Sequence, residues 1–193
     1  MSESSNFRQI NEIEKKIIIQ SLSKISPNIF QFIIRSKNLL YISLKKGNSK
    51  TFYPSIYLTS KYFQKEIDKI EFNDKIYSVG LYFGFIKKGR FYISLEGTEF
   101  LYKKGILSDI KYIYVNKKGE KSILYGNDIL KNWVTKTPLN LQKQDFLLIF
   151  NKLNEILAIA YSEVESKILQ QLKPNDVVAT TLNDKGFYLR KKQ

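Results

Sequence analysis

Lysine is the most abundant side chain in this sequence that could bind a ligand by its charge. The 193 residues include 32 Lys and Arg against 18 Asp and Glu, which gives a formal net charge of +14 and an isoelectric point near 9.7. Only Arg8, Arg35, Arg90 and Arg190 are arginine, and a lysine ammonium binds phosphate as a point charge rather than as a planar fork. This basic composition favours a polyanionic partner, and its lysines suit the backbone of a nucleic acid better than its base edges.

Side chains suited to catalysis are absent or scattered. The sequence has no Cys and no His, which excludes disulfides, thiolate zinc sites, cysteine nucleophiles and imidazole acid–base chemistry. Glu163 and Glu165 are two residues apart, as are Glu66 and Asp68, but no paired-carboxylate motif or glycine-rich phosphate loop accompanies them. We therefore predict no enzymatic activity, no catalytic or metal-binding residues and no cofactor.

The elements that must position the lysines begin with a mixed α/β region. Apolar residues at helical spacing predict an amphipathic helix over residues 6–22 that ends near Ser26. The β-rich runs NIFQFIIR and LLYISLKK predict a hairpin that turns at residues 36–38. An extended stretch follows at residues 50–58, and Thr59 and Ser60 can cap a helix over residues 60–70. Residues 75–95 predict a second hairpin that turns at Gly89, followed by a helix closed by Gly105.

From Tyr112 onward the sequence reads as short strands with brief helical pieces. Ser162 and Glu165 fit a capping box for a short helix there. A small barrel is the natural closure for so many short strands. We therefore expect an α+β protein with a mixed α/β domain and antiparallel sheet over residues 1–110 and a small β-barrel over residues 111–193. The extended runs that predict these strands are IKYIYVN, SILYG, DILKNWV, DFLLIFN, EILAIAYS, NDVVATT and GFYLRKK.

One segment of the second domain resembles a known RNA-binding module. Residues 122–131, SILYGNDILK, combine a strand end, a glycine turn and the start of a short helix, and they resemble the first strand and helix of a PUA domain. More narrowly, LYGNDILK resembles the Nip-seven family, the PUA-containing factors of large-subunit ribosome assembly. Similarity to this family continues, in the same order along the chain, at residues 56–67, 78–101, 145–162 and 173–192. We expect the chain to be an archaeal member.

The resemblance implies a site for RNA on the barrel. Gly126 would let the backbone approach RNA closely, and the helix after it would present free N–H groups to phosphate. The segment before the last strands, basic in archaeal relatives, reads SKILQQLKP here, so we expect other cations to share its role. Trp133 is the best candidate for stacking on a base. The predicted RNA-binding residues are Gly126, Asn127, Lys131, Trp133, Lys136, Lys143, Lys167, Lys173 and Arg190.

Each of these residues also has a plain structural reading. Gly126 is equally well explained as an ordinary turn, and each lysine taken singly as a solvated surface residue. Among the 13 Tyr and 13 Phe, most alternate with polar residues inside apparent strands and favour packing over base stacking. The prediction therefore depends on the lysines acting as a cluster.

The family resemblance implies a non-catalytic RNA-binding factor that acts in biogenesis of the large ribosomal subunit and in rRNA processing. Its partners would be pre-rRNA and, through the N-terminal domain, other assembly or RNA-processing proteins. One alternative is an RNA-modification enzyme, or its accessory subunit, that uses a PUA domain for targeting. Another is a protein scaffold whose lysines only keep it soluble. No apolar run approaches the roughly 20 residues of a membrane span, so we expect a cytoplasmic protein with no membrane partner.

Overall fold

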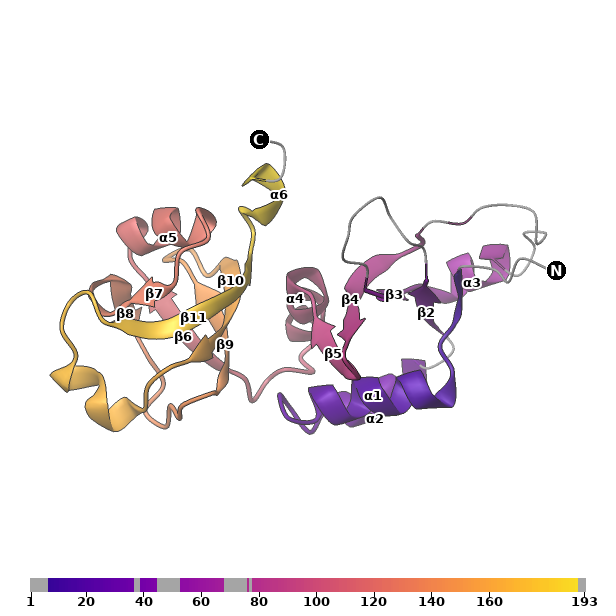
Figure 1. The fold of residues 1–193 in the computed structure, drawn as a ribbon, viewed down its shortest axis with the longest axis horizontal. Coiled ribbons are helices and arrows are strands. Elements are labelled where there is room, and N and C mark those ends of the chain that lie inside the picture. Colours follow the sequence, from indigo (N-terminus) through magenta and orange to yellow (C-terminus); the bar gives the residue numbers. More distant parts are fainter. Residues whose placement is uncertain (1–6, 37–38, 45–52, 68–75, 77, 191–193) are drawn as a thin grey trace. The chain divides into compact units, whose positions relative to one another are not determined.

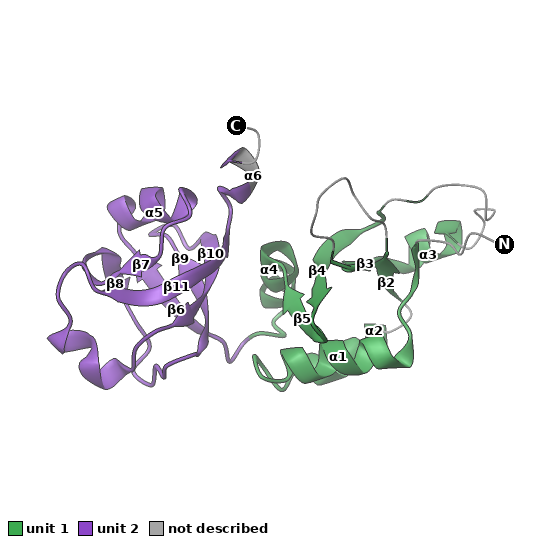
Figure 2. Ribbon diagram, viewed as in Figure 1, with its two compact units in different colours: residues 1–107 green, residues 108–193 purple. Residues whose placement is uncertain are grey.

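A computed structural model describes residues 7–36, 39–44, 53–67, 76 and 78–190. The chain divides into two compact units, residues 1–107 and residues 108–193 (Figure 2). Each unit has its own sheet. In the described part of the chain, no helix is long and apolar enough to cross a membrane.

The N-terminal unit is built on a five-stranded antiparallel sheet (Figure 1). The strands are β1 (Phe7–Gln9), β2 (Leu40–Ser43), β3 (Ser55–Leu58), β4 (Leu81–Lys87) and β5 (Arg90–Ile93), and they lie in the order β1-β2-β3-β4-β5. The expected antiparallel sheet is confirmed. The tight β4–β5 turn is also as predicted, with Gly89 at φ +70°.

The described part of this unit also contains four α-helices: α1 (Glu12–Leu22), α2 (Ile29–Ser36), α3 (Lys61–Ile67) and α4 (Leu95–Lys103). The hydroxyl of Ser21 accepts a hydrogen bond of 2.9 Å from the Phe91 backbone and so fastens α1 to β5. Helix α4 has Ser94 as its N-cap and is followed by Gly105 at φ +71°, which agrees with the predicted end of this helix.

Two predictions for the N-terminal unit were wrong. The first helix begins at Glu12, because Asn11 caps it, and Phe7–Gln9 form a strand beside β2 instead. The run NIFQFIIR is not a strand of a hairpin but helix α2. Its buried positions, Ile29 and Ile33, are four residues apart, which is the helical repeat, whereas its Ile and Phe content favoured a strand.

The C-terminal unit is a six-stranded mixed sheet that curls into a nearly closed small barrel. Its strands are β6 (Lys111–Val115), β7 (Ile129–Leu130), β8 (Val134–Lys136), β9 (Phe146–Phe150), β10 (Ile156–Ser162) and β11 (Val177–Asp184), and they lie in the order β7-β11-β10-β9-β6-β8. Five of the strand pairings are described, and of these only the pairing of β6 with β9 is parallel. The strands at the two ends of the sheet, β7 and β8, are joined by the short helix η2 (Lys131–Trp133), which brings the ends together.

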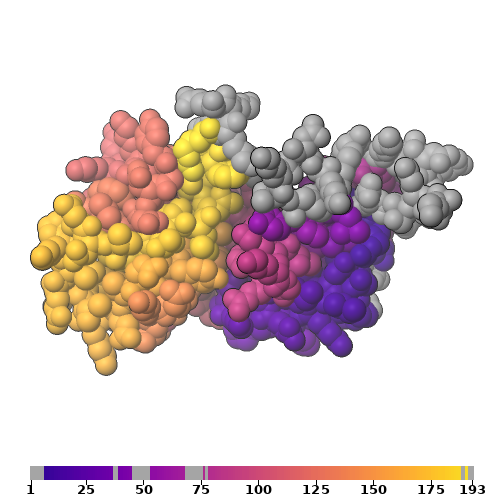
Figure 3. Space-filling view, viewed as in Figure 1, coloured from indigo at the N-terminus to yellow at the C-terminus, as the bar shows by residue number. Residues whose placement is uncertain are grey.

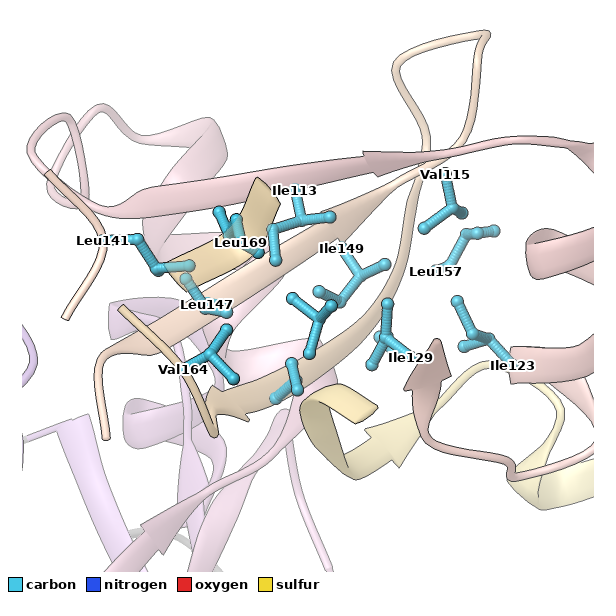
Figure 4. Close-up of a cluster of buried hydrophobic side chains, with 14 residues drawn as sticks. Ile113, Val115, Ile123, Ile129, Leu141, Leu147, Ile149, Leu157, Val164 and Leu169 are labelled. Atoms are coloured by element: carbon cyan, nitrogen blue, oxygen red, sulfur yellow. The ribbon is translucent and has the colours of Figure 1, made fainter. Parts of the chain in front are cut away.

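Aliphatic side chains of the strands and of helix α5 (Lys117–Leu124) fill the barrel. Ile113, Val115, Ile129 and Ile149 point into a common core together with Ile123 of helix α5 (Figure 4). Each is at most 1% exposed. Because side chains alternate between the two faces of a strand, the inward Ile113 and Val115 of β6 leave Tyr112 and Tyr114 on its outer face.

Three local predictions for this unit were wrong. Residues 117–124 form the helix α5 (Lys117–Leu124), capped by Asn116, where SILYG was expected to be a strand. Residues 187–190 form a helical turn, α6 (Phe187–Arg190), rather than a last strand. Ser162 and Glu165 do not form a capping box, because the Ser162 hydroxyl donates to the Val164 carbonyl at 2.7 Å and the short helix η3 begins only at Ser166 (Ser166–Gln171).

Candidate nucleic-acid interface

A surface groove of about 480 Å³ on the C-terminal unit brings three predicted lysines together. Lys131 comes from η2, Lys136 from β8 and Lys167 from η3. None of the residues that line the groove is acidic, so we call it the lysine groove. Its other lining residues are Val134, Thr135, Thr137, Pro138, Leu139, Ser166, Leu169 and Gln170.

Ser166 holds the two walls of the lysine groove together. Its hydroxyl accepts a hydrogen bond of 2.7 Å from the Leu141 amide and lies 3.1 Å from the Pro138 carbonyl, to which it donates. The Ser166 amide donates to the Leu141 carbonyl at 3.0 Å. Helix η3, drawn in gold on the surface of this unit in Figure 3, is therefore fixed against the β8–β9 connection. The groove is a built feature of the barrel.

Lys173 is placed beside the groove by the turn that precedes β11. The Lys131 amide donates to the Asp176 carbonyl at 2.9 Å, and the Asn132 amide donates to the Pro174 carbonyl at the same distance. The carboxylate of Asp176 accepts a hydrogen bond of 2.7 Å from the Lys173 amide. The structure thus brings Lys173 near Lys131, although Lys173 does not line the groove.

The electrostatics of the groove favour an anion. Within the described chain, no ion pair joins Lys131, Lys136 or Lys167 to a carboxylate. The Lys136 ammonium instead lies over the rings of Tyr112 and Tyr114, 5.6 and 5.5 Å from their centroids. Three cations in a concave surface whose lining contains no acidic residue provide the positive potential that attracts phosphate.

The predicted site at Gly126 and Asn127 has a different geometry from the one expected. Gly126 follows the C-terminus of α5, with φ +87°, instead of preceding the N-terminus of a helix. The end of a helix carries partial negative charge, so it does not attract phosphate. The Asn127 amide group donates to the Ser122 carbonyl and hydroxyl at 3.1 and 3.0 Å, which is a structural use of that side chain.

Arg190 is also engaged within the barrel. Its guanidinium makes two hydrogen bonds to the Asp184 carboxylate, at 2.9 and 2.8 Å, and a third to the Leu124 carbonyl. These hydrogen bonds to Asp184 raise the pKa of Arg190 above its ordinary value. The guanidinium lies over Gly126 and so ties α6 to the end of α5.

Trp133 does not offer a stacking surface, which corrects our expectation. Its side chain is only 7% exposed, and its Cβ lies so close to Gly119 that a side chain at Gly119 would meet it at 2.6 Å. A ring enclosed in this way cannot receive a base on its face. Lys143 is exposed in the turn before β9 and lies outside the residues that line the groove.

Sequence reasoning missed the polar groups and aromatic rings around the lysines. Thr135, Thr137, Ser166 and Gln170 line the groove and add neutral hydrogen-bonding groups. Tyr112 and Tyr114 were overlooked as functional candidates. Their alternation with Ile113 and Val115 already indicated that they face outward. Among the described residues, no cluster of three or more acidic side chains could hold a metal ion.

Comparison with known proteins agrees with this architecture. Residues 111–193 match the family model of the UPF0113 PUA domain. The chain is 29% identical over 184 residues to the UPF0113 protein of Archaeoglobus fulgidus, covering 95% of this chain and 94% of that protein. It is 25% identical over 186 residues to the 60S ribosome subunit biogenesis protein NIP7 of Saccharomyces cerevisiae, covering 95% and 96%.

Solved structures share the fold as well. A conserved PUA domain protein from Thermoplasma acidophilum superposes with a TM-score of 0.59 at 14% identity, over 96% of this chain and 98% of that one. The fold therefore defines a two-unit protein with a C-terminal PUA domain. Over almost its whole length, the chain is similar to UPF0113 and NIP7 proteins. Because similar relatives occur in both archaea and eukaryotes, the expected archaeal origin stays a prediction.

Proposed function

We propose that this protein is a non-catalytic RNA-binding factor that acts in biogenesis of the large ribosomal subunit and in processing of its rRNA. The observation that carries the proposal is the lysine groove, where Lys131, Lys136 and Lys167 converge without an acidic lining residue. The name of the yeast relative, a 60S ribosome subunit biogenesis protein, supports the ribosomal context. The relatives described above are not named as enzymes, which supports a binding role over RNA modification.

The proposed RNA partner is pre-rRNA, held by its phosphates. Lysine ammonium groups displace condensed counterions from the backbone, which gives affinity with little dependence on base identity. Of the predicted residues, we keep Lys131, Lys136, Lys167 and the adjacent Lys173 as RNA contacts, with Lys143 as a peripheral one. The N-terminal unit is proposed to contact other assembly or RNA-processing proteins, and the predicted cytoplasmic location stays with this proposal.

The test is a salt titration of RNA binding with matched triple variants. Replacing Lys131, Lys136 and Lys167 by Gln should weaken binding and reduce the slope of log K against log salt concentration by about 2 on single-stranded RNA. The control replaces the exposed Lys117, Lys118 and Lys121 of α5 by Gln, which removes the same charge from the same unit. The control should keep the slope of the unaltered protein. Equal losses in the two variants would show that a diffuse field holds the RNA and would overturn the assignment to the groove.

A second measurement addresses catalysis and the target. Incubation of the purified protein with rRNA transcripts and methyl donors should leave every nucleoside unmodified in mass spectrometry. Crosslinking in cells followed by sequencing should recover precursor rRNA. Recovery of transfer RNA alone would contradict the ribosomal role.

A further inference from the structure

Two tyrosines stand on the outside of the barrel next to the lysine groove. Tyr112 and Tyr114 alternate with the core residues Ile113 and Val115 on β6, so their rings face away from the core. Both are partly exposed. Their ring centroids are 5.7 Å apart and their planes are nearly perpendicular, at 89°. Together they present an aromatic surface that the core of the barrel does not use.

Neighbouring side chains fix these rings in place. Phe150 stacks on Tyr114 with centroids 5.4 Å apart, and it meets Tyr112 edge-on at 6.0 Å. The Tyr114 hydroxyl donates a hydrogen bond of 2.8 Å to the side-chain oxygen of Asn154. Rings held in this way lose little conformational freedom when a ligand binds, which is the property of a good recognition surface.

Lys136 joins the tyrosines to the groove. It lies opposite Tyr114 in the pairing of β8 with β6, and it also lines the lysine groove. Its ammonium lies over both rings, at 5.6 Å from Tyr112 and 5.5 Å from Tyr114. Since a phosphate is a stronger partner for an ammonium group than an aromatic ring is, a phosphate in the groove can draw Lys136 away and uncover the rings.

We propose that Tyr112 and Tyr114 form a base-stacking platform at the end of the lysine groove. One nucleotide places its phosphate on Lys136 and stacks its base on one of the two tyrosine rings, whose planes are nearly perpendicular. Proteins use aromatic stacking mainly to bind the splayed bases of single-stranded RNA, so the platform receives an unpaired nucleotide of the RNA. The inference rests on the proposed function, because the groove must hold the RNA backbone for the base to reach the rings.

The first experiment measures affinity and salt slope together. Replacing Tyr112 and Tyr114 by Leu should lower the affinity for a single-stranded RNA by about tenfold, since each base–ring stack contributes about that factor or more. The salt slope should stay unchanged, because no charge is removed. Replacing both by Phe keeps the ring faces and should retain the affinity. Tyr125→Leu is the control, since Tyr125 is 67% exposed in the same unit and lies outside the groove.

The second experiment uses the unaltered protein and does not depend on the folding of variants. Single-stranded RNA carrying 5-iodouridine is photocrosslinked to the protein, and the products are digested with trypsin. The crosslink should fall on the peptide of residues 112–117. Crosslinks found only on other peptides would overturn the platform.

The outcomes separate this inference from the proposed function. If the unaltered protein binds no RNA, the proposed function fails and the platform fails with it. If the protein binds RNA with a salt slope carried by the groove lysines, but the Leu variant binds equally well, only the platform is wrong. A Leu variant that loses slope as well as affinity would mean that the rings act by positioning Lys136, which also contradicts base stacking.

Discussion

The guanidinium of Arg190 donates two hydrogen bonds, of 2.9 and 2.8 Å, to the carboxylate of Asp184, which lies six residues earlier in the sequence. The Asp184 side chain is only 4% exposed, while that of Arg190 is 32% exposed. A third hydrogen bond reaches the Leu124 carbonyl at the end of α5. The most C-terminal cation of the described chain therefore stabilises the barrel through its pairing with a carboxylate.

Replacing Arg190 by Gln should lower the melting temperature of the protein by about 5 °C, because the buried carboxylate of Asp184 would lose its counterion. Lys143→Gln is the matched control, since it removes one exposed cation from the same unit and should leave the melting temperature unchanged. Thermal unfolding followed by circular dichroism measures both. If Arg190→Gln instead abolished RNA binding without a change in melting temperature, Arg190 would be an RNA contact after all.

Gly126→Ala should destabilise the protein by more than Gly89→Ala. Both glycines have positive φ, +87° and +70°, which costs an alanine about 1 kcal/mol. A Cβ at Gly89 meets nothing within 4 Å, whereas at Gly126 it would lie 2.9 Å from the Arg190 guanidinium. Denaturant unfolding gives the two free energies. The excess at Gly126 should disappear in an Arg190→Gln background, and its persistence there would refute the steric explanation.

Glu14 should matter more for stability than Glu12, although both lie in the first turn of α1. The Glu14 carboxylate completes a capping box with Asn11 and binds Arg8 at 2.7 and 2.9 Å. Glu14→Gln should cost about 1 kcal/mol of unfolding free energy. Glu12 is 71% exposed and, among the described residues, forms an ion pair with Lys15 alone, so Glu12→Gln should cost less than about 0.5 kcal/mol.

The lowered pKa of Glu14 predicts that the free energy of unfolding decreases at acidic pH. Burial raises its pKa, but hydrogen bonds from Arg8 and Asn11 outweigh burial and leave the pKa below its ordinary value of 4.5. The stabilisation is therefore fully present above about pH 4.5 and is lost as the pH falls through the lowered pKa. The unfolding free energy measured from pH 6 to pH 3 should fall less steeply in Glu14→Gln. Parallel curves for the two proteins would contradict this assignment.

A fragment of residues 108–193 should fold and keep most of the RNA affinity, since it contains the barrel core and the whole lysine groove. Residues 1–107 should bind RNA poorly, although they hold 18 of the 32 Lys and Arg residues. Fluorescence anisotropy with the same RNA compares the two fragments with the full chain. Equal binding by both would show that charge alone, without the groove, determines affinity.

Patterns with strong local signals were predictable from the sequence. The β4–β5 hairpin has two aromatic runs around Gly89, and β9 and β10 are continuous apolar runs at their predicted positions. Lys131, Lys136 and Lys167 could each be named as candidates from the sequence, but their convergence in one groove could not be predicted. It depends on hydrogen bonds that Ser166 and the turn before β11 make to residues distant in the sequence.

Where the amino-acid composition of a segment and the spacing of its apolar residues favoured different secondary structures, the composition gave the wrong prediction. Residues 29–36 are rich in Ile and Phe, yet the burial of Ile29 and Ile33 follows a helix. At residues 117–124 the opposite signal was missed: Asn116 caps a helix whose buried positions include Gly119 and Ile123. A helix was expected to begin after Gly126, but α5 ends just before it. The backbone groups left unpaired next to Gly126 are therefore the C=O groups of a helix C-terminus and not the N–H groups of a helix N-terminus.

The pairing of β6 with β9 and of β7 with β11 sets the order in which the barrel can assemble. Lys111 pairs with Leu147, and Ile129 pairs with Ala179. The strands β6 and β7 therefore cannot pair until β9 and β11, which come much later in the sequence, have been synthesised. Such nonlocal contacts require large loops to close first, which slows folding. A growing chain on the ribosome cannot complete the lysine groove until the Lys173–Asp176 turn has emerged, because that turn fixes Lys131. The proposed RNA-binding groove is therefore complete only when almost all of the described barrel has been made.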